Sequence, residues 1–135
     1  MKPRIVLDTN VFISILKKGR LRKILDLWLE DKFVLIVSET ILREVVEVVR
    51  RPKFNFHSSE IEMLASLILE KALIINPHHL LKVCSDPKDN KFIECAAAGK
   101  ADYIVSGDSD LLILEKYHKI EIISPANFIQ IINSK

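Results

Sequence analysis

Residues 86–112 have the sequence DPKDNKFIECAAAGKADYIVSGDSDLL, in which acidic loops flank a helix-like segment and a strand-like run. The apolar periodicity predicts a helix over residues 89–100, and the aromatic and β-branched run Tyr103–Val105 predicts a buried strand. Asp108 and Asp110 follow that strand after one serine and one glycine. Because sites in open α/β sheets form at the carboxyl ends of strands, these two acids are candidate site residues.

Asp89 is an unusual residue for the first turn of the predicted helix. At 100° per residue it projects between Ile93 and Ala96, within the apolar arc, whereas Glu94 points away. A carboxylate on a buried face needs a partner, which makes Asp89 a further candidate. The alternative is that Asp86 caps the helix and Asp89 is an ordinary acid of its first turn.

The same alternation of strand and helix continues on both sides of this stretch. Short apolar runs predict five strands, at Ile5–Leu7, Val34–Val37, Leu73–Ile75, Tyr103–Val105 and Glu121–Ile123. Amphipathic segments predict helices at Val11–Leu16, Arg20–Glu30, Glu39–Arg50, Ser59–Lys71, Asp89–Lys100, Leu111–Tyr117 and Ala126–Ile132. Helices between consecutive strands favour an α/β fold with a parallel sheet covered on both faces. The length of 135 residues predicts one domain, residues 1–135.

Composition and cysteine usage exclude several classes of protein. Ile, Leu and Val number 46 whereas Gly and Pro number eight, which excludes disordered and collagen-like chains. No apolar run approaches the ~18 residues of a membrane span, so we expect a soluble protein. Cys84 and Cys95 form neither a disulfide framework nor a metal-binding spacing. We therefore expect reduced thiols and a cytoplasmic location.

Two further acids are candidates for the same site. Asp8 ends the first predicted strand, although it could equally be an ordinary helix cap. On the predicted helix at residues 39–50, Glu44 lies at one rim of the apolar arc and Glu39 at the other, whereas Glu47 lies opposite the arc. Helical geometry alone leaves the choice between Glu44 and Glu39 open.

A convergence of four such acids would need cations or protons. Each pair of carboxylates at about 5 Å repels by about 3 kcal/mol at an effective dielectric constant of ~20. Ligation by carboxylates alone selects Mg²⁺ or Mn²⁺ over Zn²⁺. The formal net charge is +2, and leaving out Asp8, Glu44, Asp89, Asp108 and Asp110 raises it to +7. An acidic centre within a basic surface suits a polyanion.

The basic residues gather at residues 17–23, which have the sequence KKGRLRK. We expect this cluster to bind nucleic acid through Lys17, Lys18, Arg20, Arg22 and Lys23, although a solvated helix end would give the same pattern.

Residues 6–14 (VLDTNVFIS), residues 38–45 (SETILREV), residues 86–112 and residues 123–129 (ISPANFI) resemble PIN-domain proteins. The resemblance covers nearly the whole chain and is strongest to the small toxin components related to VapC. It implies a three-layer α/β/α sandwich with a five-stranded parallel sheet. It also implies Mg²⁺- or Mn²⁺-dependent ribonuclease activity, homodimerisation and an antitoxin partner.

Carried over residue by residue, the resemblance assigns the four acids of the family and favours Glu44 over Glu39. As implied by the resemblance, the catalytic and metal-binding residues are Asp8, Glu44, Asp89 and Asp108, with Asp110 as an auxiliary metal ligand. Asn10 and Ser106 would support the metal ligands, and Ser106 stands where many members have threonine.

We expect from this an endoribonuclease in which one or two metal ions activate a water molecule for phosphodiester hydrolysis. We expect it to be the toxin of a toxin–antitoxin pair. The alternatives are a PIN nuclease of RNA processing and a non-catalytic PIN scaffold that binds nucleic acid. A phosphatase with Asp8 as nucleophile is disfavoured, because Asn10 stands where such enzymes need a second aspartate.

The predicted helix at residues 59–71 favours self-association. Its apolar residues spread over roughly 240° of the helical wheel, whereas packing against one sheet needs ~100°. Excess apolar surface on a small protein favours contact with another chain, here a second copy. The alternative is that this helix lies between its own sheet and a neighbouring helix.

Overall fold

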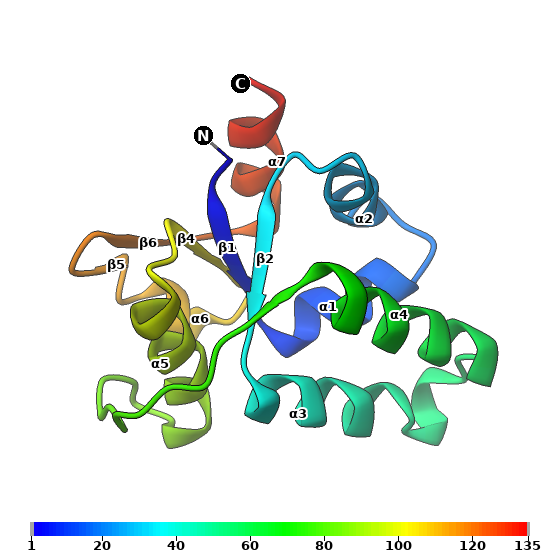
Figure 1. Ribbon diagram of the computed structural model, residues 1–135, viewed down its shortest axis with the longest axis horizontal. Helices are drawn as coiled ribbons and strands as arrows, with labels where there is room; N and C mark the ends of the chain where they lie inside the picture. Colours follow the sequence, from blue (N-terminus) through cyan, green and yellow to red (C-terminus); the bar gives the residue numbers. More distant parts are fainter. Residues whose placement is uncertain (1, 135) are drawn as a thin grey trace.

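The computed structural model describes residues 2–134 and has one mixed sheet with helices on both faces (Figure 1). The strand order is β3-β2-β1-β4-β6-β5. The strands are β1 (Arg4–Leu7), β2 (Val34–Val37), β3 (Leu73–Ile74), β4 (Tyr103–Val105), β5 (Lys116–Tyr117) and β6 (Ile120–Ile123). The helices are α1 (Thr9–Leu16), α2 (Arg22–Leu29), α3 (Glu39–Val49), α4 (Ser58–Lys71), α5 (Asn90–Gly99), α6 (Ser109–Leu112) and α7 (Pro125–Asn133), with 3₁₀ turns η1 (Pro52–Phe54) and η2 (Pro87–Asp89).

The central strands are buried on both faces, which explains their uninterrupted apolar sequences. Ile5, Val6, Ile104 and Val105 are fully buried where β1 pairs with β4 in parallel. Helix α5 packs on β1, β2 and β4. This packing requires a glycine, because a Cβ atom on Gly99 would lie 2.8 Å from the Ile36 side chain. The three-layer α/β architecture predicted from the sequence is confirmed.

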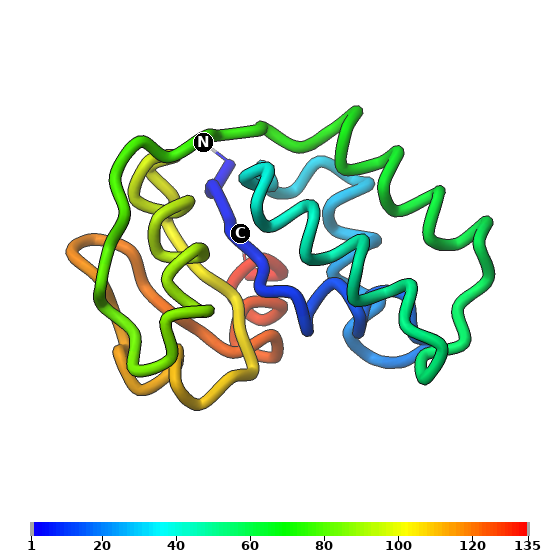
Figure 2. The backbone as a smooth tube through the Cα atoms, turned by 90° about the horizontal axis from the view of Figure 1, so that it is seen from below, coloured from blue at the N-terminus to red at the C-terminus, as the bar shows by residue number. Residues whose placement is uncertain are grey.

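Three strands end directly at a helix cap, which brings polar groups to one edge of the sheet. Asp8, Ser38 and Ser124 follow β1, β2 and β6, and each side chain accepts a hydrogen bond from a backbone N–H in the first turn of the next helix. The long segment from β3 to η2 crosses from the α4 side of the molecule to the α5 side (Figures 1 and 2). It delivers η2 to the same edge.

The expectation of five parallel strands is wrong in one respect. A sixth strand, β5, pairs with β6 in antiparallel register at the edge of the sheet. The expected helix at residues 111–117 is correspondingly wrong, because α6 ends at Leu112 and residues 116–117 are extended. Glu115 and His118 have φ values of 60° and 54°, so the chain turns sharply on both sides of β5. Lys116–Tyr117 has no apolar run that would indicate a strand, whereas the equally short β3 lies within the apolar run Leu73–Ile75.

Helix α4 exposes part of the excess apolar surface that the sequence predicted for it. Leu64 and Ile68 are buried, and α4 packs against α3. Met63 and Leu69 are 38% and 61% exposed. Leu73 and Ile74 of the neighbouring edge strand β3 are also exposed. Within residues 2–134, no helix has the length and apolarity needed to cross a membrane.

Candidate active site

An acidic pocket lies at the carboxyl ends of β1 and β4. Its volume is about 270 Å³. The four acids predicted from the sequence all line it, together with Asn10 and several residues that sequence reasoning did not select. The lining residues are Asp8, Thr9, Asn10, Glu44, Val48, Arg51, Asp86, Lys88, Asp89, Phe92 and Asp108.

Asp8 is fixed in the pocket by the start of α1 and by β4. Its Oδ1 accepts a hydrogen bond of 2.9 Å from the backbone N–H of Val11, and its Oδ2 accepts one from the hydroxyl of Ser106. Only 4% of Asp8 is exposed. Burial raises the pKa of its carboxyl group, against the lowering effect of these two hydrogen bonds, and nearby Asp108 and Glu44 raise it further.

Ser106 connects two acids through one hydroxyl group. It donates to Asp8, and its oxygen accepts a hydrogen bond of 2.9 Å from the backbone N–H of Asp108. The Asp108 carboxylate in turn accepts a hydrogen bond of 2.9 Å from the backbone N–H of Asp110. Ser106 is fully buried and holds Asp8 through the hydrogen bond from its hydroxyl. Asn10 is exposed at the mouth of the pocket.

Asp89 has a buried carboxylate oxygen for which the described part of the chain provides no hydrogen-bond donor. It lies at the end of η2 and is 9% exposed. Among residues 2–134, its Oδ2 is the buried side-chain oxygen without a hydrogen-bond partner. Burial is the largest cause that raises the pKa of Asp89 to about 6, and the negative charges of Asp108 and Asp86 add to it. A buried carboxylate oxygen without a donor needs a cation or a proton.

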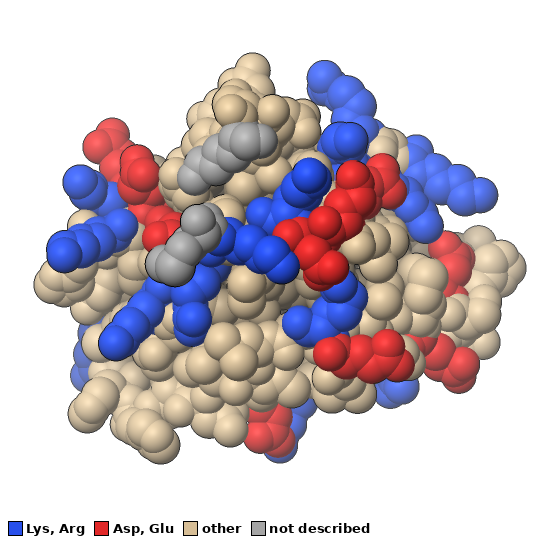
Figure 3. Space-filling model, turned by 45° about the horizontal axis from the view of Figure 1, so that its top comes forward, with Lys and Arg blue, Asp and Glu red and all other residues tan. Residues whose placement is uncertain are grey.

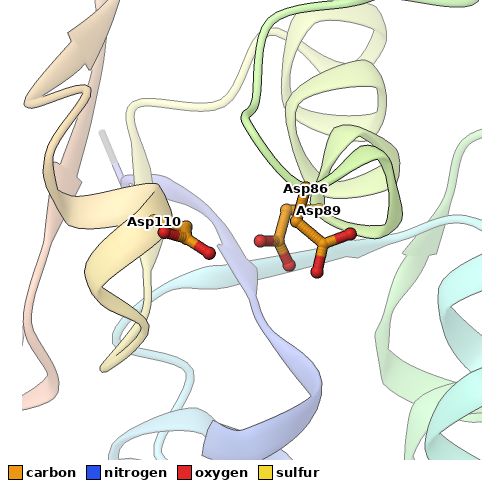
Figure 4. Close-up of side chains that lie close together, drawn as sticks. All are labelled: Asp86, Asp89 and Asp110. Atoms are coloured by element: carbon orange, nitrogen blue, oxygen red, sulfur yellow. The ribbon is translucent and has the colours of Figure 1, made fainter.

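One oxygen each of Asp86, Asp89 and Asp110 lies within 4.8 Å of the others. Figure 4 shows Asp86 and Asp89 at the start of α5 and Asp110 on α6, with the three carboxylates directed toward a common space. Sequence reasoning treated Asp86 solely as a cap. It does cap η2, because its Oδ1 accepts a hydrogen bond of 3.0 Å from the backbone N–H of Lys88. The spacing of three residues between Asp86 and Asp89 was the available signal that both face one space.

Glu44 lies in the pocket and Glu39 does not. Glu39 forms an exposed ion pair with Arg43 on the same helix. Glu44 projects from α3, and its Oε1 lies 2.5 Å from Nζ of Lys91 on α5. Its other oxygen accepts a hydrogen bond from the hydroxyl of Thr9. Both oxygens of Glu44 therefore have donors, and Lys91 is a residue of the site that the sequence did not indicate.

The predicted basic cluster borders a second, larger hollow. Lys17, Arg20 and Lys23 line a hollow of about 830 Å³ together with Ser124 at the start of α7. Gly107 also lines it, and the next residue, Asp108, lines the acidic pocket.

The remaining members of the basic cluster differ in their surroundings. The guanidinium group of Arg22 donates to the carbonyl oxygen of Leu16 at 3.3 Å, and Lys18 is exposed. On the face seen in Figure 3, by contrast, Lys and Arg are interspersed with Asp and Glu.

Comparisons with known proteins agree with this geometry. The family model described as PIN domain matches residues 4–110, which include β1, the pocket and Asp110. The chain belongs to the PIN domain family. An uncharacterized protein of Methanocaldococcus jannaschii is 38% identical over 143 aligned residues, covering 96% of this chain and 92% of that protein.

Two solved structures share the PIN fold with this chain. One is VapBC2 of Rickettsia felis bound to a DNA fragment from its promoter, with a TM-score of 0.59 and 14% identity over 90% of this chain and 98% of the matched chain. The other is a VapC toxin of Mycobacterium tuberculosis that cleaves the sarcin–ricin loop, with a TM-score of 0.55 and 14% identity over 87% of this chain and 98% of that toxin. At this identity the likeness concerns the fold.

Proposed function

We propose that this PIN domain is a divalent-metal-dependent endoribonuclease. The observation that carries the proposal is the unpartnered Oδ2 of Asp89, a buried oxygen beside Asp86 and Asp110. A purely structural carboxylate would have a donor from the protein for each of its buried oxygens. The missing donor is accounted for by a cation that binds there.

The donor set fits Mg²⁺ or Mn²⁺, because it consists of carboxylate oxygens without imidazole or thiolate. We assign the metal to Asp89, Asp8 and Asp108, with Asp110 and Asp86 at the same ion. Glu44 completes the acidic wall of the pocket, and Asn10 and Ser106 support the ligands. When bound, the ion supplies positive charge to the scissile phosphate and lowers the pKa of an attacking water molecule.

The residues of the chain have separate tasks in this proposal. Ser106 holds Asp8 in one orientation through its hydrogen bond. Arg51 and Lys88 line the acidic pocket and would contact the phosphates next to the scissile one. The predicted cluster of Lys17, Lys18, Arg20, Arg22 and Lys23 would hold the strand beyond Gly107, which lines the basic hollow. Attack by water expels the 3′ oxygen, which takes up a proton and leaves a 5′-phosphate on the other product.

The relatives suggest the biological setting. Since the two structural neighbours are a VapC toxin that cleaves ribosomal RNA and a VapBC pair, we propose that the protein is the RNA-cleaving toxin of a toxin–antitoxin pair in the cytoplasm. The free thiols of Cys84 and Cys95 agree with a reducing compartment.

Cleavage of a structured RNA tests the proposed function. We expect the wild type to cut in Mn²⁺ or Mg²⁺ and to stop in EDTA, and we expect products with 5′-phosphate and 3′-hydroxyl ends. The Asp89→Asn variant should be inactive, whereas the Glu39→Gln variant should cut normally because Glu39 lies outside the pocket. Full activity in EDTA, or 2′,3′-cyclic phosphate as the main product, would contradict the proposal.

We also propose a homodimer that forms through α4 and the edge strand β3. The support is the exposed apolar group of Met63, Leu69, Leu73 and Ile74 on these adjoining elements. Light scattering at micromolar concentration should give twice the chain mass of 15.5 kDa. Leu69→Glu should restore the monomer mass, and a monomeric wild type would contradict the dimer.

A further inference from the structure

One acid that lines the pocket, Glu44, is paired with a cation that the chain itself supplies. The ammonium group of Lys91 lies 2.5 Å from Glu44 Oε1 and 5.6 Å from the centre of the Phe92 ring, and both Glu44 and Phe92 line the pocket. Glu44 Oε2 is occupied as well, by the hydroxyl of Thr9. Asp8 also has a donor on each oxygen, but both of its donors are neutral, whereas one donor of Glu44 is a cation.

This ion pair differs from the ordinary surface pair on the same helix. The side chains of Lys91 and Glu44 are 18% and 30% exposed, whereas those of Arg43 and Glu39 are 78% and 59% exposed. A surface pair is screened by water and contributes little. The partly buried pair joins α3 to α5 across 47 positions of the sequence. It holds a positive charge directly against Glu44, in addition to Arg51 and Lys88, which line the pocket.

The pocket consequently has two electrostatically different sides. Asp86, Asp89 and Asp110 bring three carboxylate oxygens within 4.8 Å of one another, and Glu44 is not part of that group. On the Glu44 side, the ammonium group of Lys91 already balances the charge of the carboxylate, and its own charge repels a second divalent ion.

We propose that Lys91 replaces a second metal ion at Glu44, so that each chain holds one divalent ion, on the Asp89 side. This inference rests on the proposed function. Glu44 is then a positioning residue for Lys91 and not a metal ligand. The fixed ammonium group takes the role that a second cation has in two-metal nucleases, which is to neutralise charge next to the substrate phosphate.

Mn²⁺ titration measures the ion count directly, by calorimetry on the intact protein and by the spin-resonance signal of unbound Mn²⁺. We expect one ion per chain for the wild type and two for Lys91→Met, in which Glu44 is released. Arg43→Met is the matched control, because it removes a cation from an ion pair on α3 outside the pocket. It should bind one ion with wild-type affinity.

The double variant Glu44→Gln/Lys91→Met decides whether Glu44 is a ligand. It replaces the ion pair by a neutral pair of similar size, so the charge of the pocket is unchanged. We expect one Mn²⁺ ion with a Kd within threefold of the wild type. A loss of tenfold or more would overturn the inference, because it would make Glu44 a ligand. Lys91→Gln repeats the ion count if the methionine variant does not fold, as judged by circular dichroism.

The possible failures can be told apart. Two ions in the wild type, or one ion in both Lys91 variants, would overturn the role of Lys91 and leave the proposed nuclease intact. Absence of Mn²⁺ binding in every variant would overturn the metal-dependent function itself, and the inference with it.

Discussion

The two sides of the acidic pocket differ in how the protein satisfies their charges. On the Glu44 side, a lysine and a threonine occupy both carboxylate oxygens. On the Asp89 side, three carboxylates face one another and one buried oxygen has no donor. The difference teaches that counting acids does not define a metal site. The pairing of each acid matters as well, because Lys91 already pairs with Glu44 whereas the buried Oδ2 of Asp89 has no hydrogen-bond partner among residues 2–134.

The largest expected effect is the loss of RNA cleavage when an acid on the Asp89 side is replaced. We expect Asp89→Asn to lower RNA cleavage by about 100-fold or more, because it removes a ligand of the proposed ion while the fold remains. Asp8→Asn and Asp108→Asn should act similarly. Cleavage rates at saturating Mn²⁺, with circular dichroism as a check of folding, provide the measurement. Undiminished activity of Asp89→Asn would show that the site is elsewhere.

A smaller loss is expected on the Glu44 side. Glu44→Gln leaves the ammonium group of Lys91 without its partner but retains the ligands on the other side, so we expect cleavage to fall by about tenfold. Glu39→Gln is the matched control on the same helix, since its ion pair with Arg43 lies on the exposed surface. A larger loss with Glu39→Gln than with Glu44→Gln would reverse the assignment of these two residues.

Asp89→Asn, which should lower activity, should raise the free energy of unfolding of the metal-free protein. The pKa of Asp89 is raised from its ordinary value of 3.8 to about 6, chiefly by burial. Above pH 6 its ionisation therefore destabilises the fold, and this cost disappears as the pH falls from about 6 to about 4. We expect Asp89→Asn to stabilise the metal-free protein by up to about 3 kcal/mol at pH 7.5 and to have little effect at pH 4.

Urea unfolding of both proteins in EDTA at the two pH values measures this difference. Asp110→Asn is the control, because Asp110 belongs to the same group of acids but is exposed. An equal effect of Asp89→Asn at both pH values would mean that the ionisation of Asp89 does not oppose folding.

The smallest expected effect concerns the basic cluster. Arg20 lines the hollow next to the acidic pocket, whereas the guanidinium group of Arg22 is bound to the carbonyl of Leu16. We expect Arg20→Gln to weaken RNA binding by about threefold at moderate salt and to reduce its salt dependence. Arg22→Gln should weaken binding less. Fluorescence anisotropy with a labelled RNA over a series of salt concentrations measures both, and equal effects would show that the hollow does not guide the strand.

The sequence predicted most of the fold because the central strands are short and fully apolar. A run such as Ile5–Leu7 is buried on both faces, and its periodicity does not depend on distant residues. The edge strand β5 was missed because Lys116–Tyr117 is held by a hairpin with β6 and has no apolar run, unlike the equally short β3.

The candidate site was predicted in part, for a similar reason. Asp8, Asp89 and Asp108 stand next to predicted strands and helices, so their place in the chain already indicated a common edge of the sheet. Asp86 was taken for a cap, which it also is. Lys91 carries no signal in the sequence, because its contact with Glu44 depends on how α5 packs beside α3.

The sequence by itself determined how the main strands and helices follow one another along the chain. It also determined the burial of the central strands and the acids that follow them. These features are local, because periodicity and capping depend on neighbouring residues. The tertiary structure decided which carboxylates have donors. It pairs Glu44 with Lys91, leaves Glu39 outside the pocket and leaves one oxygen of Asp89 unpartnered. The physical reason is that hydrogen bonds and ion pairs between distant segments depend on the packing of helices against the sheet, which local patterns do not contain.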